Sequence, residues 1–234
     1  MTRPGAEGAV ALPGSLRRSL ERLGAFFAGP LSRARPLVPR GLRERFDALV
    51  FDMRVFGLPD RIYLEQRLLP ALARQGACRV LFVGTAWFTA RYAAIFDRPG
   101  SLYHTLDRSP EAEGAAPGNH YVADLRDVAT LFPPGSFDLA VVNGVFGFGL
   151  NTPEDMTAAL RAVHRVLRPA GRLLLGWNPD RIPDPLALPG RVEAFQPTGI
   201  QGLPARARIA SFDKHVHVFD LLEAVAVERE RQAS

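Results

Sequence analysis

The chain has 234 residues, of which 47% are hydrophobic, and a formal net charge of +5. This length suits one sizeable core with an appendage, and no apolar run is long enough to span a bilayer. The single cysteine, Cys78, excludes an intrachain disulfide and a multi-cysteine metal site. The only lysine, Lys214, follows no phosphate-loop pattern, which argues against a P-loop NTPase.

Positive charge is concentrated near the N-terminus. Nine arginines against three glutamates give residues 1–45 a charge of +6, which leaves −1 for the remainder. Because the excess positive charge lies in this arm, we expect that the rest of the chain does not bind nucleic acid. A basic amphipathic helix from Ser15 either contacts an anionic membrane surface, through residues 15–45, or packs on its own domain. We expect a cytoplasmic protein that is either free or peripheral to the membrane.

The predicted division of the chain is a basic arm with a helical extension, 1–76, followed by a main domain, 77–234. The extension includes a helix that ends near Gly76, in which three leucines recur every four residues: Leu64, Leu68 and Leu72. This helix is expected to cover one edge of a ligand crevice. Either Tyr63 or Arg67 reaches a ligand there, or both side chains pack.

The main domain opens with the apolar run Arg79–Val83, rich in β-formers and typical of a strand buried on both faces of a parallel sheet. Gly84 follows at once. A glycine there lets the backbone turn sharply, and the N–H groups at the start of the next helix attract a polar or anionic group. An ordinary strand-to-helix turn is the alternative, because lone glycine turns have many false positives.

Acidic residues end the next two predicted strands. Ser101–Leu106 is followed by Asp107, and a carboxylate at this strand end can accept both hydrogen bonds of a ribose diol. His120–Ala123 is followed by Asp124, which can accept a hydrogen bond from an adenine amino group, with Leu125 beside the ring. The alternatives are a simple cap at Asp107 and a solvated carboxylate at Asp124.

Strands and helices alternate through the rest of the chain. They are, in order, a strand Phe137–Val142 before Asn143, a helix from the Asn151–Asp155 start signals to Pro169–Gly171, a strand Arg172–Trp177, a proline-rich loop over 178–204 and two strands within 205–227. This alternation predicts an α/β fold with a doubly wound, mostly parallel sheet of seven strands, Rossmann-like, with an N-terminal helical extension.

The run from Phe137 to Trp177, FDLAVVNGVFGFGLNTPEDMTAALRAVHRVLRPAGRLLLGW, resembles the fourth-strand to fifth-strand segment of class I S-adenosylmethionine-dependent methyltransferases. With RVLFVG, the strand that ends at Asp107 and the run VADL, the resemblance extends over about residues 78–178. It implies a Rossmann-like fold, S-adenosylmethionine as cofactor and methyl transfer as the reaction.

The resemblance also implies binding roles, residue by residue. Gly84, Thr85 and Ala86 would line the methionine part of the cofactor, Asp107 would bind the ribose hydroxyls, Asp124 and Leu125 would frame adenine, and Asn143 would face the transferable methyl. Three positions depart from the family pattern, since Phe82 replaces an acidic residue, and Ala86 and Phe88 replace glycines. We expect Trp87 to close over the ligand by stacking or by shape.

Catalytic groups are harder to assign, because methyl transfer needs chiefly in-line positioning of a nucleophile and only sometimes a base. The candidate bases are His104, His120, His215 and His217. The last two alternate in the run KHVHVF, so a strand places both on one face, which looks either into the crevice or to solvent. The catalytic candidates are therefore His215, His217 and Asn143. Without a third ligand nearby, we expect no metal at this pair.

Three functions remain open from the residues. The first is methyl transfer to a small molecule or to a glycan- or lipid-linked intermediate. The second is a catalytically silent cofactor-fold module that binds a partner, which the bulky glycine loop suggests. The third is a different reaction on the same cofactor, such as an intramolecular cyclisation.

Overall fold

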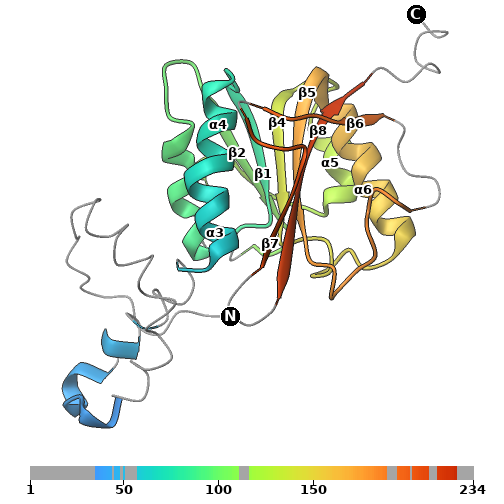
Figure 1. The fold of residues 1–234 in the computed structure, drawn as a ribbon. Coiled ribbons are helices and arrows are strands. Elements are labelled where there is room, and N and C mark those ends of the chain that lie inside the picture. The colour runs from blue at the N-terminus through green and yellow to red at the C-terminus, as the bar shows by residue number, and fades with distance from the viewer. Residues whose placement is uncertain are drawn as a thin grey trace, which may run out of the picture.

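One mixed β-sheet runs through the molecule, with helices on both faces (Figure 1). The computed structural model describes residues 35–43, 45–47, 50, 57–110, 116–188, 194–200, 202–210 and 215–225. The strands are β1 (Arg79–Val83), β2 (Leu102–Asp107), β3 (His120–Val122), β4 (Phe137–Asn143), β5 (Leu167–Trp177), β6 (Phe195–Pro197), β7 (Arg206–Ala210) and β8 (Val216–Ala224).

The strands follow the order β3-β2-β1-β4-β5-β8-β6, with β7 also paired to β8. The first five are parallel, whereas β8 is antiparallel to β5. β6 pairs with residues 222–224 and β7 with residues 216–220, so the two lie in succession along the outer edge of β8. The predicted α/β class with a mostly parallel, seven-position sheet is confirmed. An eighth strand is present because two strands, β6 and β7, share the outer edge of β8. β6 lies within residues 178–204, which were predicted as a loop.

The helices are α3 (Pro59–Tyr63), the π-helical turn η3 (Leu64–Leu68), α4 (Leu69–Arg74), α5 (Val128–Leu131) and α6 (Pro153–Val166), with short 3-10 helices η1 (Arg35–Leu37), η2 (Arg40–Leu42), η4 (Trp87–Ile95) and η5 (Leu125–Asp127). The chain after Gly84 thus enters a 3-10 helix. Residues 169–171, predicted to close the long helix, already belong to β5, because α6 ends at Val166.

Alternate side chains of each strand pack on opposite helical layers, as a period of two requires. In β1, Leu81 and Val83 join the core that contains α6, whereas Val80 and Phe82 join the core that contains α4. Figure 1 shows α3 and α4 on one side of the sheet and α5 and α6 on the other. The sheet is therefore doubly wound, and its carboxyl edge is left open for a ligand.

The helix that precedes β1 is a layer of this same core. Leu64, Leu68 and Leu72 each keep 1% of their surface exposed, against strand residues such as Phe82 and Phe219. The predicted division at residue 76 stays a prediction, and residues 15–34 lie outside the described ones. Within the part of the chain that the structure describes, no helix has the length and apolarity to cross a bilayer.

Candidate active site

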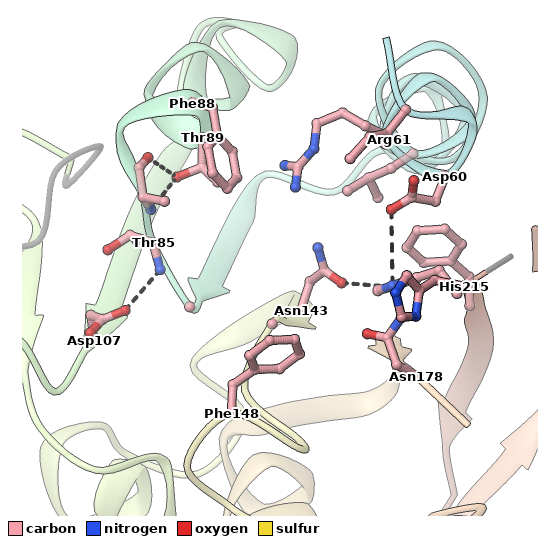
Figure 2. Close-up of a pocket in the computed structure, with 17 residues that line it drawn as sticks. Asp60, Arg61, Thr85, Phe88, Thr89, Asp107, Asn143, Phe148, Asn178 and His215 are labelled. Atoms are coloured by element: carbon pink, nitrogen blue, oxygen red, sulfur yellow. Dashed lines mark hydrogen bonds and ion pairs between the residues drawn. The ribbon is translucent and has the colours of Figure 1, made fainter. Parts of the chain in front are cut away.

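A crevice opens at the carboxyl ends of the parallel strands (Figure 2). Open α/β sheets bind ligands at this edge. Its cavity has a volume of about 390 Å³, within the range of roughly 300–1,000 Å³ that is usual for ligand pockets. Turns after β1, β2 and β4 line one wall, which we name the strand-end wall. α3 and β8 line the other, which we name the outer wall.

Gly84 ends β1 and turns the chain with φ at +85°. A Cβ at this position would lie 2.2 Å from the carbonyl oxygen of Asn143 and 2.9 Å from Cγ2 of Val145. Only glycine tolerates both the positive φ and this close approach of the β1 and β4 ends. The sharp turn predicted after β1 is therefore present, and its geometry requires the residue found there.

Asp107 ends β2 with its carboxylate held from two sides. Oδ2 accepts a hydrogen bond from the N–H of Thr85 at 2.9 Å, and Oδ1 accepts one from the N–H of Ser109 at 2.9 Å. Each carboxylate oxygen keeps a further lone pair for a ligand. Asp107 lines both the main cavity and a smaller cavity of about 80 Å³, so its carboxylate lies where the two adjoin.

Asp124 and Leu125 line the smaller cavity. Oδ1 of Asp124 accepts hydrogen bonds from the backbone N–H and the Nε–H of Arg126, both at 2.9 Å, and Oδ2 accepts one from its terminal nitrogen at 3.0 Å. These side-chain hydrogen bonds hold the pKa of Asp124 below its ordinary value. The carboxylate is thus oriented at the cavity, but part of its acceptor capacity is already used.

The bulky loop after β1 narrows the crevice without filling it. Thr85, Ala86 and Phe88 line the main cavity, whereas Trp87 is not among its lining residues. The indole of Trp87 meets the ring of Phe88 edge-on, with centroids 5.5 Å apart. Oγ1 of Thr89 accepts a hydrogen bond from the N–H of Ala86 and donates one to its carbonyl oxygen, which tightens the turn.

Asn143 lies between the two walls of the crevice (Figure 2). Its Oδ1 is 3.0 Å from Nε2 of His217 on β8, a residue 74 positions further along the chain. Gly176 on β5 makes room for this pair, because a Cβ there would lie 2.0 Å from Asn143 Oδ1 and 2.8 Å from His217 Nε2. The strand-end wall and the outer wall therefore meet through one hydrogen bond.

His217 is a largely buried imidazole. Only 12% of its side chain is exposed, and its Nδ1 lies 4.0 Å from Oδ2 of Asp60. Burial lowers the pKa of His217 to about 4, while Asp60 acts to raise it and Arg61 to lower it. An unprotonated imidazole can accept a proton at pH 7. His215 lines the same cavity but is exposed, with Nδ1 2.8 Å from Oδ2 of Asp180.

The other two candidate bases lie away from the crevice. The ring of His104 packs against Phe132 and Phe137, with centroid distances of 5.8 and 5.5 Å. Nδ1 of His120 is 3.0 Å from Oγ1 of Thr105. Of the four histidines, the structure thus brings only His215 and His217 to the cavity.

Asp60 and Arg61 are the charged lining residues that sequence reasoning missed. The same helix offered Tyr63 and Arg67 as candidates. The ring of Tyr63 instead packs 6.2 Å from that of Phe219, and Arg67 is exposed. The available signal was an acidic residue in the first helical turn, which is equally typical of any helix N-terminus.

The sheet order, with one reversed strand beside β5, and the crevice at the carboxyl edge define a methyltransferase-like α/β domain. Residues 83–175, somewhat less than half of the chain, match the family described as a methyltransferase domain. This segment therefore matches the class of domain predicted from the sequence, that of the S-adenosylmethionine-dependent methyltransferases.

Known proteins resemble the chain over part of its length. The ubiquinone/menaquinone biosynthesis C-methyltransferase UbiE of Pseudoalteromonas translucida (strain TAC 125) is 29% identical over 133 residues, 53% of this chain and 51% of that protein. The chain thus spans about half the length of this curated relative. The N-methyltransferase NodS from Bradyrhizobium japonicum WM9, solved with S-adenosylhomocysteine, has a TM-score of 0.54 at 17% identity, covering 71% of this chain and 88% of that one. This last likeness concerns the fold alone.

Proposed function

We propose that the chain binds S-adenosylmethionine in the crevice and transfers its methyl group to a second molecule. The observation that carries the proposal is the meeting of two cavities at Asp107, beside the turn at Gly84. Asp107 would hold the ribose of a bound nucleoside where the two cavities adjoin, Leu125 would lie beside adenine in the smaller cavity, and the larger cavity would hold the amino-acid part. When bound, this cofactor supplies an electrophilic methyl group on a sulfonium.

The residues present fit such a ligand. Gly84 leaves no Cβ in the cradle between β1 and β4, and Asp107 keeps lone pairs for a diol. Oγ1 of Thr85 is buried and has no hydrogen-bond partner, and a bound polar ligand is a standard explanation for such a group. Phe88 takes the wall position that we expected for Trp87.

His217 is the proton acceptor that we assign to the reaction, with His215 as the exposed alternative. Burial lowers the pKa of the imidazole. Because Oδ1 of Asn143 can only accept a hydrogen bond, Nε2 of His217 carries the hydrogen, and the lone pair that can accept a proton is on Nδ1. A hydroxyl or amine that loses its proton on methylation passes this proton to Nδ1 of His217. Asp60, 4.0 Å from Nδ1, then stabilises the imidazolium.

For the acceptor we propose a small molecule or a glycan- or lipid-linked intermediate. By name, UbiE is a C-methyltransferase of quinone biosynthesis and NodS is an N-methyltransferase, so carbon and nitrogen acceptors both occur among similar proteins. The charge of −1 outside residues 1–45 gives no attraction for nucleic acid. We keep peripheral membrane contact through residues 15–45 as part of the proposal. Equal flotation with anionic vesicles after deletion of these residues would remove it.

Calorimetry with the full chain tests the cofactor. We expect S-adenosylmethionine and S-adenosylhomocysteine both to bind and to raise the melting temperature. If neither binding heat nor a thermal shift is observed, the result would instead favour a catalytically silent module, which Ala86 and Phe88 suggest. With an acceptor in hand, a product heavier by one methyl group distinguishes methyl transfer from cyclisation.

A further inference from the structure

Arg61 brings a positive charge into the crevice from α3, a helix outside the segment that matches the methyltransferase family. In Figure 2 its side chain extends from the helix toward Phe88, and no dashed line joins it to another residue drawn. A guanidinium is charged at every physiological pH. A half-buried cation at the wall of a cavity therefore needs either solvent or an anion to compensate it.

Neighbouring side chains hold this guanidinium in place. Burial raises the pKa of Glu65, while Arg91 and Arg61 act to lower it, and this carboxylate is already paired with Arg91. A terminal N–H donates to the hydroxyl of Tyr92 at 2.9 Å, and Cζ lies 4.0 Å above the ring of Phe88. The Tyr92 hydroxyl donates in turn to Glu65 at 2.8 Å, and Glu65 also pairs with Arg91. Among the described residues, no carboxylate forms an ion pair with Arg61, and its Nε is buried without a hydrogen-bond partner.

Neither carboxylate of the crevice forms an ion pair or a hydrogen bond with Arg61. Oδ2 of Asp60 lies 4.0 Å from Nδ1 of His217, and its Oδ1 is buried without a hydrogen-bond partner. Asp107 accepts hydrogen bonds from the backbone N–H groups of Thr85 and Ser109. Arg61 is thus a preorganised cation whose anionic partner is missing from the protein, as far as its described residues go.

We propose that Arg61 binds a carboxylate of the ligand that occupies this crevice. The planar guanidinium presents several donors in a rigid fork, which matches the two oxygens of a carboxylate. The network through Tyr92 and Phe88 orients the side chain before binding, so less entropy is lost when the ligand arrives. The inference rests on the proposed function, and the carboxylate belongs either to the amino-acid part of the cofactor or to the methyl acceptor.

The test compares two adenosine ligands by calorimetry. S-adenosylhomocysteine carries the amino-acid carboxylate, whereas methylthioadenosine lacks it. If the carboxylate belongs to the cofactor, Arg61→Met lowers the affinity for S-adenosylhomocysteine on the order of 10- to 100-fold, as the loss of a hydrogen-bonded charge pair predicts. Methylthioadenosine then binds with unchanged affinity, and Arg61→Lys lies between the wild type and Arg61→Met.

Benzoate tests whether the carboxylate belongs to the methyl acceptor, because it carries a carboxylate on an aromatic ring. If the carboxylate is the acceptor's, S-adenosylhomocysteine binds Arg61→Met as it binds the wild type. Benzoate, titrated into the protein saturated with S-adenosylhomocysteine, then binds the wild type and not Arg61→Met. The matched control is Arg67→Met in η3, the π-helical turn that continues α3, because the exposed side chain of Arg67 does not line the cavity. It should leave all three affinities unchanged.

Three results would overturn the inference. The first is that no ligand distinguishes Arg61→Met from the wild type. The second is an equal loss for both adenosine ligands, which would assign Arg61 to the structure of the pocket. The third is that Arg67→Met lowers the ligand affinities as much as Arg61→Met does. If the wild type binds neither adenosine ligand, the proposed function fails, while benzoate titrated into the free protein still decides the role of Arg61. Should Arg61→Met not fold, Arg61→Lys supplies the same comparison.

Discussion

The two walls of the crevice differ in how they are built. The strand-end wall, with Gly84 and Asp107, consists of turns that directly follow parallel strands. The N–H of Thr85 joins two of these turns by donating a hydrogen bond to the carboxylate of Asp107. The outer wall brings Arg61 and His217 together from α3 and β8, which are far apart in the chain. The first wall is thus a consequence of the sheet itself, whereas the second depends on what packs beside the sheet. Substitutions should therefore affect stability most at the first.

Gly84→Ala should cause the largest loss. The new Cβ would meet the carbonyl oxygen of Asn143 at 2.2 Å, and backbone atoms cannot move aside cheaply. We expect the free energy of unfolding to fall by about 3–5 kcal/mol, from strained φ and overpacking together. Urea denaturation measures this.

Gly100→Ala is the matched control for that substitution, since its φ is +80° but nothing lies within 4 Å of the added Cβ. It should cost only about 1–2 kcal/mol. Equal losses at the two glycines would show that the approach of β1 and β4 contributes nothing.

Stability of the outer wall should depend on pH through His217. The folded-state pKa of about 4 lies below the ordinary value of 6.5, so the unfolded chain binds the proton more readily. The contribution of unprotonated His217 to the free energy of unfolding is fully present above pH 6.5. It is lost as the pH falls toward 4, and the total loss is about 3 kcal/mol.

His217→Gln isolates this contribution from that of the carboxylates. Urea denaturation at pH 7.5 and pH 4 should show a smaller loss of stability for the variant than for the wild type. Parallel losses would mean that His217 titrates normally in the folded protein.

Asp107→Ala should weaken the binding of S-adenosylhomocysteine by roughly 1–3 kcal/mol, because the substitution leaves polar groups of the ligand unpaired. Calorimetry measures the affinity, and a thermal melt checks that the loop bonded to Asp107 persists. Asp127→Ala, an exposed aspartate that lines neither cavity, is the control and should bind normally. An unchanged affinity for Asp107→Ala would remove the ribose assignment.

Gly176→Ala should have the smallest effect on stability. Its Cβ would meet Asn143 Oδ1 at 2.0 Å and His217 Nε2 at 2.8 Å, and both are ends of side chains that can rotate away. We expect a loss of about 1 kcal/mol in unfolding free energy, together with a shift of the ring nitrogen signals of His217 in the NMR spectrum. A loss as large as that of Gly84→Ala would contradict the distinction between the two walls.

Sequence patterns were sufficient for the strand-end wall because they are local. A buried strand before a glycine predicted β1 and its turn, and an acidic residue after an apolar run predicted the end of β2 at Asp107. The orientation of the helix before β1 was not readable in this way. Its leucines define a face, but the π-helical turn η3 between α3 and α4 shifts the phase of that face. Packing therefore decided that Asp60 and Arg61, rather than Tyr63 or Arg67, line the crevice.

By itself, the sequence determined the α/β class, the resemblance to the methyltransferase family and the order of strands from β1 to β5, since periodicity and turn residues act over a few positions. Only the tertiary structure decided that His217 reaches Asn143, because this contact needs β8 to run antiparallel beside β5 in one register. It also decided that Phe88, and not Trp87, lines the cavity. Contacts between distant strands and the rotation of a helix follow from filling the core, to which every element contributes.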